Sequence, residues 1–194
     1  MKRILLTTLA VILCLGTITI NAEDIQLTPK EQIIKRIIAS NYSYTPTGFF
    51  QAIGNGNLDC VNLFLKAGFD PNTTNMTMPA IYFAVIEKQP KIVDRLLNAG
   101  VDPNTNFKGR TILYQAIATK NVETVKALIK HGVNVNEQSW GETPINYAVK
   151  KKNEDIVTLL LNSGAKIDNE TLKYALKSKN SEIKNAVLYK YKKQ

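Results

Sequence analysis

Ala99 to Asn104 reads AGVDPN, and related stretches stand at three other places in the chain, all in register. They are AGFDPN at 67–72, HGVNVN at 131–136 and SGAKID at 163–168. The glycine of each copy recurs every 32 residues, at Gly68, Gly100, Gly132 and Gly164. A fixed period of this length is typical of a solenoid, in which each repeat buries its apolar face against the next repeat.

Two helices are predicted in each repeat, and the second ends just before the glycine. Apolar residues seven and three positions before the glycine are four apart, so they share one helix face. The glycine itself is typical of a left-handed helix end, which only glycine adopts without Cβ strain. A shorter first helix surrounds an alanine sixteen residues before each glycine, and a polar link predicts a projecting hairpin between repeats. The recurring residues are Val61, Val93, Val125 and Val157, then Leu65, Leu97, Ile129 and Leu161, then Ala52, Ala84, Ala116 and Ala148.

The segments that lead into these alanines share a second motif. It reads TPINYA at 143–148 and TILYQA at 111–116, with weaker copies PAIYFA at 79–84 and TGFFQA at 47–52. Together with the GVDPN and GVNVN endings, these segments resemble the ankyrin repeat family from Thr45 to Asn169. The resemblance implies helix-turn-helix repeats with hairpin fingers, and protein binding as the general role. The chain departs from the family in its 32-residue unit and in lacking the signature histidine. It also carries lysine where the family has a glycine between the two helices, at Lys88, Lys120 and Lys152, with only Gly56 retained.

We therefore predict an all-α fold, an α-solenoid of about four ankyrin-like repeats with capping helices at both ends. The predicted units are 45–76, 77–108, 109–140 and 141–169, followed by a degenerate repeat or cap at 170–194. Residues 23–44 are predicted to hold the N-terminal capping helix. It would begin at Thr28, whose side chain and Glu31 form a capping box. The apolar stripe of that helix would be Ile33, Ile34, Ile37 and Ile38.

The first 22 residues have the anatomy of a secretory signal peptide. Lys2 and Arg3 precede an apolar run, and Ala22 stands before two acidic residues. We expect cleavage after Ala22 and export to the periplasm or the exterior of a bacterium; an uncleaved anchor over 4–22 is the alternative. Cleavage would leave Cys60 as the only cysteine, so no internal disulfide could form.

Catalytic and metal-binding groups are sparse in this sequence. His131 is the only histidine, and Cys60 aligns with the core residues Ile92 and Ile156. We interpret both as structural, because they cannot form a metal cluster or a nucleophile–base pair. The sequence therefore predicts a protein that is not an enzyme and needs no cofactor.

What the repeats offer instead is a surface made of finger tips and first-helix residues. Each finger carries one large apolar side chain beside polar or charged ones, an arrangement common at the centre of protein interfaces. The alignment also places Ser139 at a tip. Packing of the tip side chains against the neighbouring finger is the alternative role, and for Trp140, the only tryptophan, we favour contact with a partner. The candidate partner-binding residues are Met76, Met78, Glu87, Phe107, Lys108, Arg110, Thr119, Trp140, Glu142, Lys150 and Lys151.

The leading hypothesis is thus a monomeric scaffold that binds another protein of unknown identity through its concave face. A second hypothesis follows from the net charge of +9. Eight lysines against three acidic residues lie between 166 and 194, so this end could contact an anionic membrane or nucleic acid. Nucleic acid is the weaker candidate, because the chain has 21 lysines but only four arginines, and arginine is the better reader of phosphates and bases.

Overall fold

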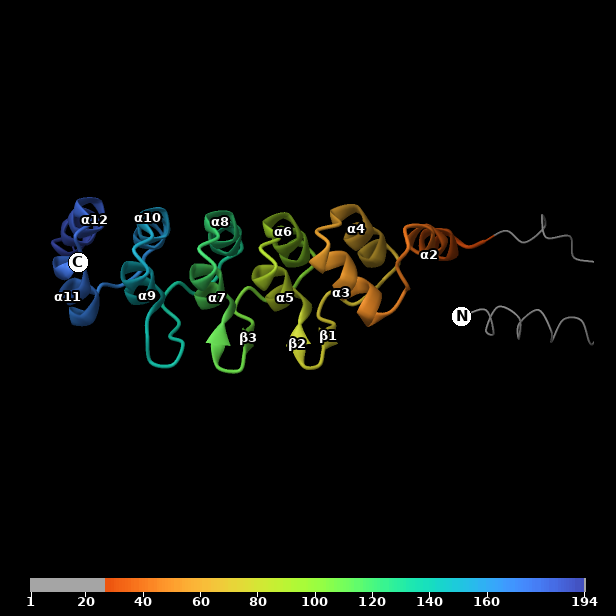
Figure 1. Ribbon diagram of the computed structural model, residues 1–194, viewed down its shortest axis with the longest axis horizontal. Coiled ribbons are helices and arrows are strands. Elements are labelled where there is room, and N and C mark those ends of the chain that lie inside the picture. The colour runs from red at the N-terminus through yellow and green to blue at the C-terminus, as the bar shows by residue number, and fades with distance from the viewer. Residues whose placement is uncertain (1–26, 194) are drawn as a thin grey trace, which may run out of the picture.

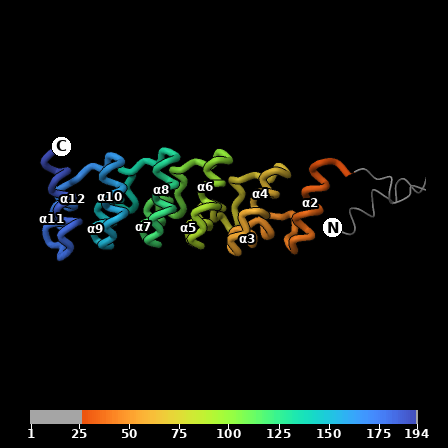
Figure 2. The backbone as a smooth tube through the Cα atoms, turned by 90° about the horizontal axis from the view of Figure 1, so that it is seen from above, coloured from red at the N-terminus to blue at the C-terminus, as the bar shows by residue number. Residues whose placement is uncertain are grey.

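The computed structural model describes residues 27–193, which form a row of stacked helix pairs. The predicted signal peptide at 1–22 lies outside the described residues. Figures 1 and 2 show the helices arranged in two rows along the stack, and Figure 1 shows hairpins that project from the row of first helices. The prediction of an α-solenoid is confirmed.

The first row contains α3 (Pro46–Gly54), α5 (Ala80–Ile86), α7 (Ile112–Ala118), α9 (Pro144–Lys150) and α11 (Asn169–Lys177). The second row contains α4 (Leu58–Lys66), α6 (Pro90–Asn98), α8 (Val122–Lys130), α10 (Glu154–Asn162) and α12 (Ser181–Tyr191). The stack begins with α2 (Pro29–Ala39), which packs against α4.

Three hairpin fingers each lead from a second-row helix to the first-row helix of the next repeat. In the first, β1 (Thr74–Asn75) pairs antiparallel with β2 (Met78–Pro79), and in the second, β3 (Asn106–Phe107) pairs with β4 (Arg110–Thr111). The third finger is closed by a single bridge between Ser139 and Glu142. Both central residues of each turn have positive φ, the pattern of a type I′ hairpin turn. The predicted unit boundaries fall between these two residues and stay predictions.

The core lies between the two rows and repeats with the sequence period. Every one of the recurring alanines and valines is fully buried, and the position three before the glycine is buried or half-buried. Cys60 is also buried, among apolar side chains, as expected. The helix rows can therefore approach closely in all repeats, which explains why a small residue recurs on the first helix.

Asparagines connect neighbouring repeats at the loops after the second helices. The Asn104 carboxamide oxygen accepts a hydrogen bond from the Asn134 backbone N–H at 2.8 Å. One repeat further on, the Asn136 oxygen accepts from the Lys166 N–H at 2.8 Å, and its amide donates to the Gly164 carbonyl at 3.2 Å. The final residue of the motif thus satisfies backbone groups of the following repeat.

The N-terminal cap agrees with the sequence-based prediction except at one residue. Thr28 and Glu31 form the expected capping box at the start of α2. Ile37 is buried and Ile33 packs against the core, but Ile38 is 49% exposed, so its assignment to the buried stripe was wrong. A helix of 11 residues turns about three times, and only one side of α2 meets the first repeat. None of the described helices is both long and apolar enough to cross a membrane.

Lysines occupy left-handed backbone positions between the paired helices. Lys88, Lys120 and Lys152 have φ of 54°, 55° and 55°, where the first repeat has Gly56 at 67°. A left-handed conformation costs a residue with a Cβ roughly 1–2 kcal/mol. Glycine avoids this strain, but the greater entropy of its unfolded state cancels part of the gain in stability.

We expect Lys120→Gly to raise the free energy of unfolding by about 0.5–1 kcal/mol, because it removes this strain from an exposed residue. Urea denaturation measures the change. Lys120→Ala is the control, since alanine keeps the Cβ; an equal gain for alanine would contradict the explanation.

Candidate protein-binding surface

The finger face, formed by the first-row helices and the fingers, contains an apolar groove near the N-terminal end of the stack. The groove has a volume of about 740 Å³ and lies between α3, α5 and the first two fingers. Its apolar lining consists of Phe50, Met76, Met78, Phe83 and Phe107. The rings of Phe50 and Phe83 lie 5.3 Å apart, and Phe107 packs at 5.3 Å against Tyr82 of α5. These contacts hold the aromatic walls in place.

The second and third fingers are joined through Arg110. Its guanidinium carbon lies 4.5 Å from the centre of the Trp140 ring and 5.7 Å from that of Tyr114. One guanidinium nitrogen, Nη1, donates a hydrogen bond to the Gln115 side chain at 2.7 Å, and the Tyr82 hydroxyl donates to the same oxygen at 3.3 Å. Arg110 is thereby fixed between two aromatic rings at the foot of the fingers.

A second set of contacts continues along the face toward the C-terminus. The Tyr114 hydroxyl donates to Glu142 Oε2 at 3.0 Å, and Lys150 Nζ forms an ion pair with Glu142 Oε1 at 2.6 Å. Lys150 Nζ also lies 4.4 Å from the centre of the Tyr174 ring. Burial and the Glu142 carboxylate raise the pKa of Tyr114 well above its ordinary value, so this phenol remains a hydrogen-bond donor. The carboxylate likewise raises the pKa of Lys150.

A family model of ankyrin repeats (3 copies) matches residues 26–107 and 81–171, which together span most of the chain. The chain belongs to the ankyrin repeat family. Ankyrin repeats are generally protein–protein interaction modules, and proteins built from them are typically non-catalytic scaffolds. No curated protein matches the chain in a sequence comparison. Across residues 27–193, no three His, Cys, Asp or Glu side chains are grouped so that they could hold a metal ion.

The candidate residues of this ankyrin repeat protein differ in how much of each side chain is free. Met76 is almost fully exposed at the tip of the first finger, and Trp140 is 64% exposed at the third. Glu142 is tied to Tyr114 and Lys150, and the Thr119 hydroxyl donates to the Ala116 carbonyl. The remaining candidates are exposed or half-buried on this face or at its edge: Met78, Glu87, Phe107, Lys108, Arg110, Lys150 and Lys151. Their roles in binding stay predictions.

Ser139 does not project from the tip as the alignment indicated. It is fully buried, because its hydroxyl accepts a hydrogen bond from the Thr111 N–H at 3.0 Å and lies 3.1 Å from the Thr111 hydroxyl. The third finger therefore packs against the second finger at its base. The same contact brings Trp140 over Arg110, so the tip tryptophan touches its neighbour while keeping most of its surface exposed.

Sequence reasoning missed the tyrosines that support this face. Tyr82 and Tyr114 stand where the ankyrin family has histidine, and the interpretation stopped at the lost histidine. The rings of Tyr114 and Tyr147 stack at 3.9 Å with an angle of 16°, linking two first-row helices. Aromatic residues at this position in three consecutive repeats, Phe50, Tyr82 and Tyr114, were the available signal for an aromatic row.

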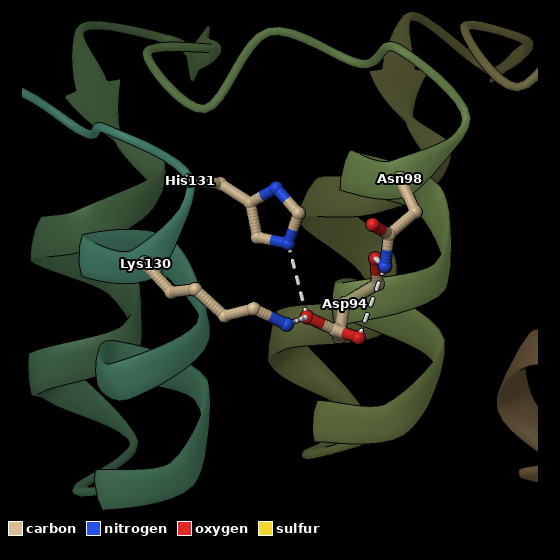
Figure 3. A network of polar contacts seen from close by, with 4 residues as sticks. All are labelled: Asp94, Asn98, Lys130 and His131. Atoms are coloured by element: carbon tan, nitrogen blue, oxygen red, sulfur yellow. Dashed lines mark hydrogen bonds and ion pairs between the residues drawn. The ribbon is translucent and has the colours of Figure 1, made fainter.

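The opposite face of the ankyrin stack carries a charged network beside a second groove. The Asp94 side chain of α6 contacts three residues (Figure 3). Its Oδ1 accepts a hydrogen bond from Lys130 Nζ at 3.2 Å and lies 3.0 Å from His131 Nε2, while its Oδ2 accepts a hydrogen bond from the Asn98 side chain. A groove of about 590 Å³ beside it is lined by residues of α4, α6 and α8. His131 thus connects two second-row helices, in line with its interpretation as structural.

The Asp94 network gives a pH-dependent contribution to stability. A hydrogen bond from His131 is the main cause that holds the pKa of Asp94 below its ordinary value of 3.8. The hydrogen bond and the positive charge of Lys130 lower this pKa further. A carboxylate with a lowered pKa stabilises the fold above about pH 4, and this stability is lost as pH falls through the lowered pKa.

We therefore expect the free energy of unfolding of the native sequence to fall more between pH 6 and pH 3 than that of Asp94→Asn. The difference should stay below about 1 kcal/mol, because the carboxylate is about a third exposed and screened by water. Urea titrations at the two pH values test this, and identical pH dependence would refute it.

Proposed function

We propose that this ankyrin repeat protein is a non-catalytic scaffold that binds another protein through its finger face. The observation that carries the proposal is the choice of residues at the finger turns. Met76 and Trp140 have φ of 46° and 53°, at positions where a type I′ turn favours Asn or Gly. A bulky side chain is strained there. Met76 is 93% exposed, so burial offsets little of its strain, whereas packing on Arg110 offsets the strain of Trp140 and still leaves 64% of that side chain exposed. Binding to a partner accounts for this choice.

The groove beside the first finger supports the same surface. Five large apolar side chains line it, and a concave apolar site with a few polar groups at its edge is the usual form of an anchor pocket at interfaces. The second-row face has mainly charged and polar residues around its groove, among them Lys91, Asp94 and Glu123. A partner that needs apolar anchors would therefore select the finger face.

Site-specific photocrosslinking in cells that express the protein tests the proposal. A photoreactive amino acid is placed at Met76 or Trp140 on the finger face, and at the exposed Lys126 of α8 as a control. We expect both finger positions to crosslink the same protein and the control position not to do so. Crosslinking of that protein from residue 126 alone, or from none of the three, would contradict the proposal.

Trp140→Asn separates a binding role from a structural role. It would place Asn-Gly at the turn, the preferred type I′ pair, while removing the ring that packs on Arg110. These two effects are each about 0.5–1 kcal/mol and opposite in sign, so we expect the free energy of unfolding to change by less than about 0.5 kcal/mol. Crosslinking from Met76 should nevertheless fall severalfold. Thermal melting combined with crosslinking yield makes the measurement; unchanged yield would assign the ring to the fold.

We further propose that the protein is exported, with a signal peptide removed after Ala22. The support is the order of a basic start, an apolar run and a small residue before the acidic pair Glu23 and Asp24. Mass spectrometry of the protein recovered from the envelope and the medium of its source bacterium tests this. A mature N-terminus at Glu23 is expected, and a retained Met1 would refute cleavage.

A second candidate function is contact with an anionic membrane through the C-terminal cap. The observation that favours it is the exposure of Tyr189 and Tyr191 on α12 beside Lys190 and Lys192, since tyrosines are enriched at membrane interfaces and lysines are attracted to anionic lipids. Co-sedimentation with vesicles of anionic phospholipid should then be strong in low salt and weak in 0.5 M salt. Absence of binding in low salt would rule it out.

A further inference from the structure

Arg110 is a cation that the structure holds in place without an acidic partner. Stacking on Trp140 and Tyr114 and the hydrogen bond to Gln115 fix its guanidinium on the finger face. Across residues 27–193, no carboxylate lies within ion-pair distance of it. A guanidinium has five N–H donors in a rigid fork that suits carboxylates, and here its Nη1 donates to the Gln115 side chain at 2.7 Å.

Two further lysines on the finger face have the same property. Lys108 lies 5.1 Å above the Phe107 ring and Lys151 lies 5.1 Å above the Tyr147 ring, and neither forms an ion pair with a residue in 27–193. The acidic side chains among the candidate residues are Glu87 and Glu142, and Glu142 is already neutralised by Lys150 at 2.6 Å. The face therefore presents an excess of positive charge on rigid aromatic supports.

We propose that the partner presents an acidic segment with one large apolar side chain to this face. The apolar side chain occupies the groove of Phe50, Met76, Met78, Phe83 and Phe107, and a carboxylate of the segment accepts hydrogen bonds from Arg110. This inference rests on the proposed function and specifies the chemistry of the protein that is bound.

The relative positions of the two subsites support one continuous ligand. Phe107 and Lys108 line the groove, and Arg110 stands on the same finger, two residues after Lys108. Tyr82 joins them, since its ring packs on Phe107 and its hydroxyl shares the Gln115 oxygen with Arg110. A short extended segment can reach both subsites, because an extended chain advances about 3.3 Å per residue.

Charge complementarity selects an acidic partner over a basic one. The chain has a net charge of +9, so a basic segment would be repelled over a distance of about 8–10 Å at ordinary ionic strength. The groove makes a purely polyanionic ligand a poorer match, because it would leave the apolar lining of the groove exposed.

Fluorescence anisotropy with three synthetic 12-residue peptides tests the proposal on residues 23–194, the chain without the proposed signal peptide. One peptide has a single central phenylalanine flanked by four Asp and Glu residues, the second has the same phenylalanine flanked by four lysines, and the third has the acidic residues without the phenylalanine. A single-stranded DNA 12-mer serves as a generic polyanion. We expect the first peptide to bind at least tenfold more tightly than each of the other three probes.

Arg110→Gln should weaken binding of the first peptide about tenfold, and Arg110→Lys should restore only part of it, because lysine keeps the charge but lacks the fork. Lys126→Gln is the matched control: it removes one positive charge from the opposite face and should leave the affinity within twofold. Circular dichroism and melting establish that each variant is folded. If Arg110→Gln melts at a much lower temperature than the native protein, the peptide affinity of Arg110→Lys is compared with that of Lys126→Gln instead.

Equal affinity for the basic peptide or for DNA, or an effect of Lys126→Gln equal to that of Arg110→Gln, would overturn the proposal. The crosslinking experiment described under the proposed function distinguishes failure of the acidic-partner proposal from failure of the scaffold role. Crosslinks from Met76 and Trp140 to a protein without an acidic, apolar-anchored segment would leave the scaffold role standing and refute the acidic partner.

Discussion

Replacing Phe64 with alanine is expected to lower the free energy of unfolding by about 3–5 kcal/mol, the usual loss for a fully buried phenylalanine ring. Phe64 lies on α4 and is inaccessible to water. Its ring stacks on Tyr44 at 5.6 Å and contacts Phe49 at 5.2 Å and Phe69 at 5.2 Å. Removing it leaves a cavity bordered by three rigid rings, which cannot easily move in to fill the space.

Because this aromatic cluster lies beside the N-terminal cap, the loss of stability extends beyond the first repeat. Tyr44 follows the N-terminal capping helix α2, which packs on α4, and its hydroxyl donates to the Ala67 carbonyl at 3.1 Å. In a solenoid each repeat contacts only its neighbours, so a weakened first repeat loses its cap as well.

Urea denaturation followed by circular dichroism measures this loss. Phe83→Ala is the control, because Phe83 is half-exposed in the groove and its removal should cost roughly 1 kcal/mol, from the smaller area buried. Equal losses for the two variants would show that the cluster around Phe64 is no better packed than the groove wall.

The repeat architecture was predictable because it depends on residues at a fixed spacing. The period of 32, the buried alanines and the valines on one helix face define which surfaces meet, and burial confirms each of them. Local signals such as the Thr28 capping box were predictable for the same reason, since all the atoms involved lie within four residues.

The arrangement of the fingers was not predictable, because it depends on contacts between residues 26–30 positions apart. Ser139 and Trp140 look equivalent in an alignment, as neighbouring polar-link residues. Only the hydrogen bonds of Ser139 to Thr111 make one of them buried and set the other over Arg110. The Gln115 oxygen that accepts from Arg110 is also shared with the Tyr82 hydroxyl, 33 positions earlier in the chain, and no sequence motif signals this contact. The sequence therefore placed Arg110 among the candidate residues, but it did not predict the aromatic rings and the Gln115 side chain that hold its guanidinium.

Strain at the finger turns and rigidity of the finger face are two parts of one arrangement. A scaffold that binds without chemistry gains affinity mainly from surfaces that need no ordering on association. Aromatic contacts from Phe50 to Tyr174, with cations stacked between them, provide such a surface along the first-row helices. The strained turns then hold exposed side chains in fixed directions at its edge.

The first repeat differs from the others because no finger precedes it, and Gly48 shows the consequence. The chain from α2 crosses directly over the start of α3, and a Cβ on Gly48 would lie 1.9 Å from the Ser43 carbonyl oxygen. The equivalent residues of later repeats, Ala80, Ile112 and Pro144, all carry side chains and are buried without such a clash. The glycine at this position is thus required by the link to the cap.

Gly48→Ala is therefore expected to lower the free energy of unfolding by about 1–3 kcal/mol or more, because the obstacle is backbone and the link must move. Gly54→Ala in the same helix should act in the opposite direction. Its Cβ would meet only the Phe83 ring at 3.5 Å, an ordinary contact, and alanine favours the helix over glycine by roughly 0.5–1 kcal/mol. Urea denaturation of the two variants side by side makes the comparison. A loss in both would mean that α3 tolerates no added carbon, whereas a loss confined to residue 48 identifies the crossing link as the cause.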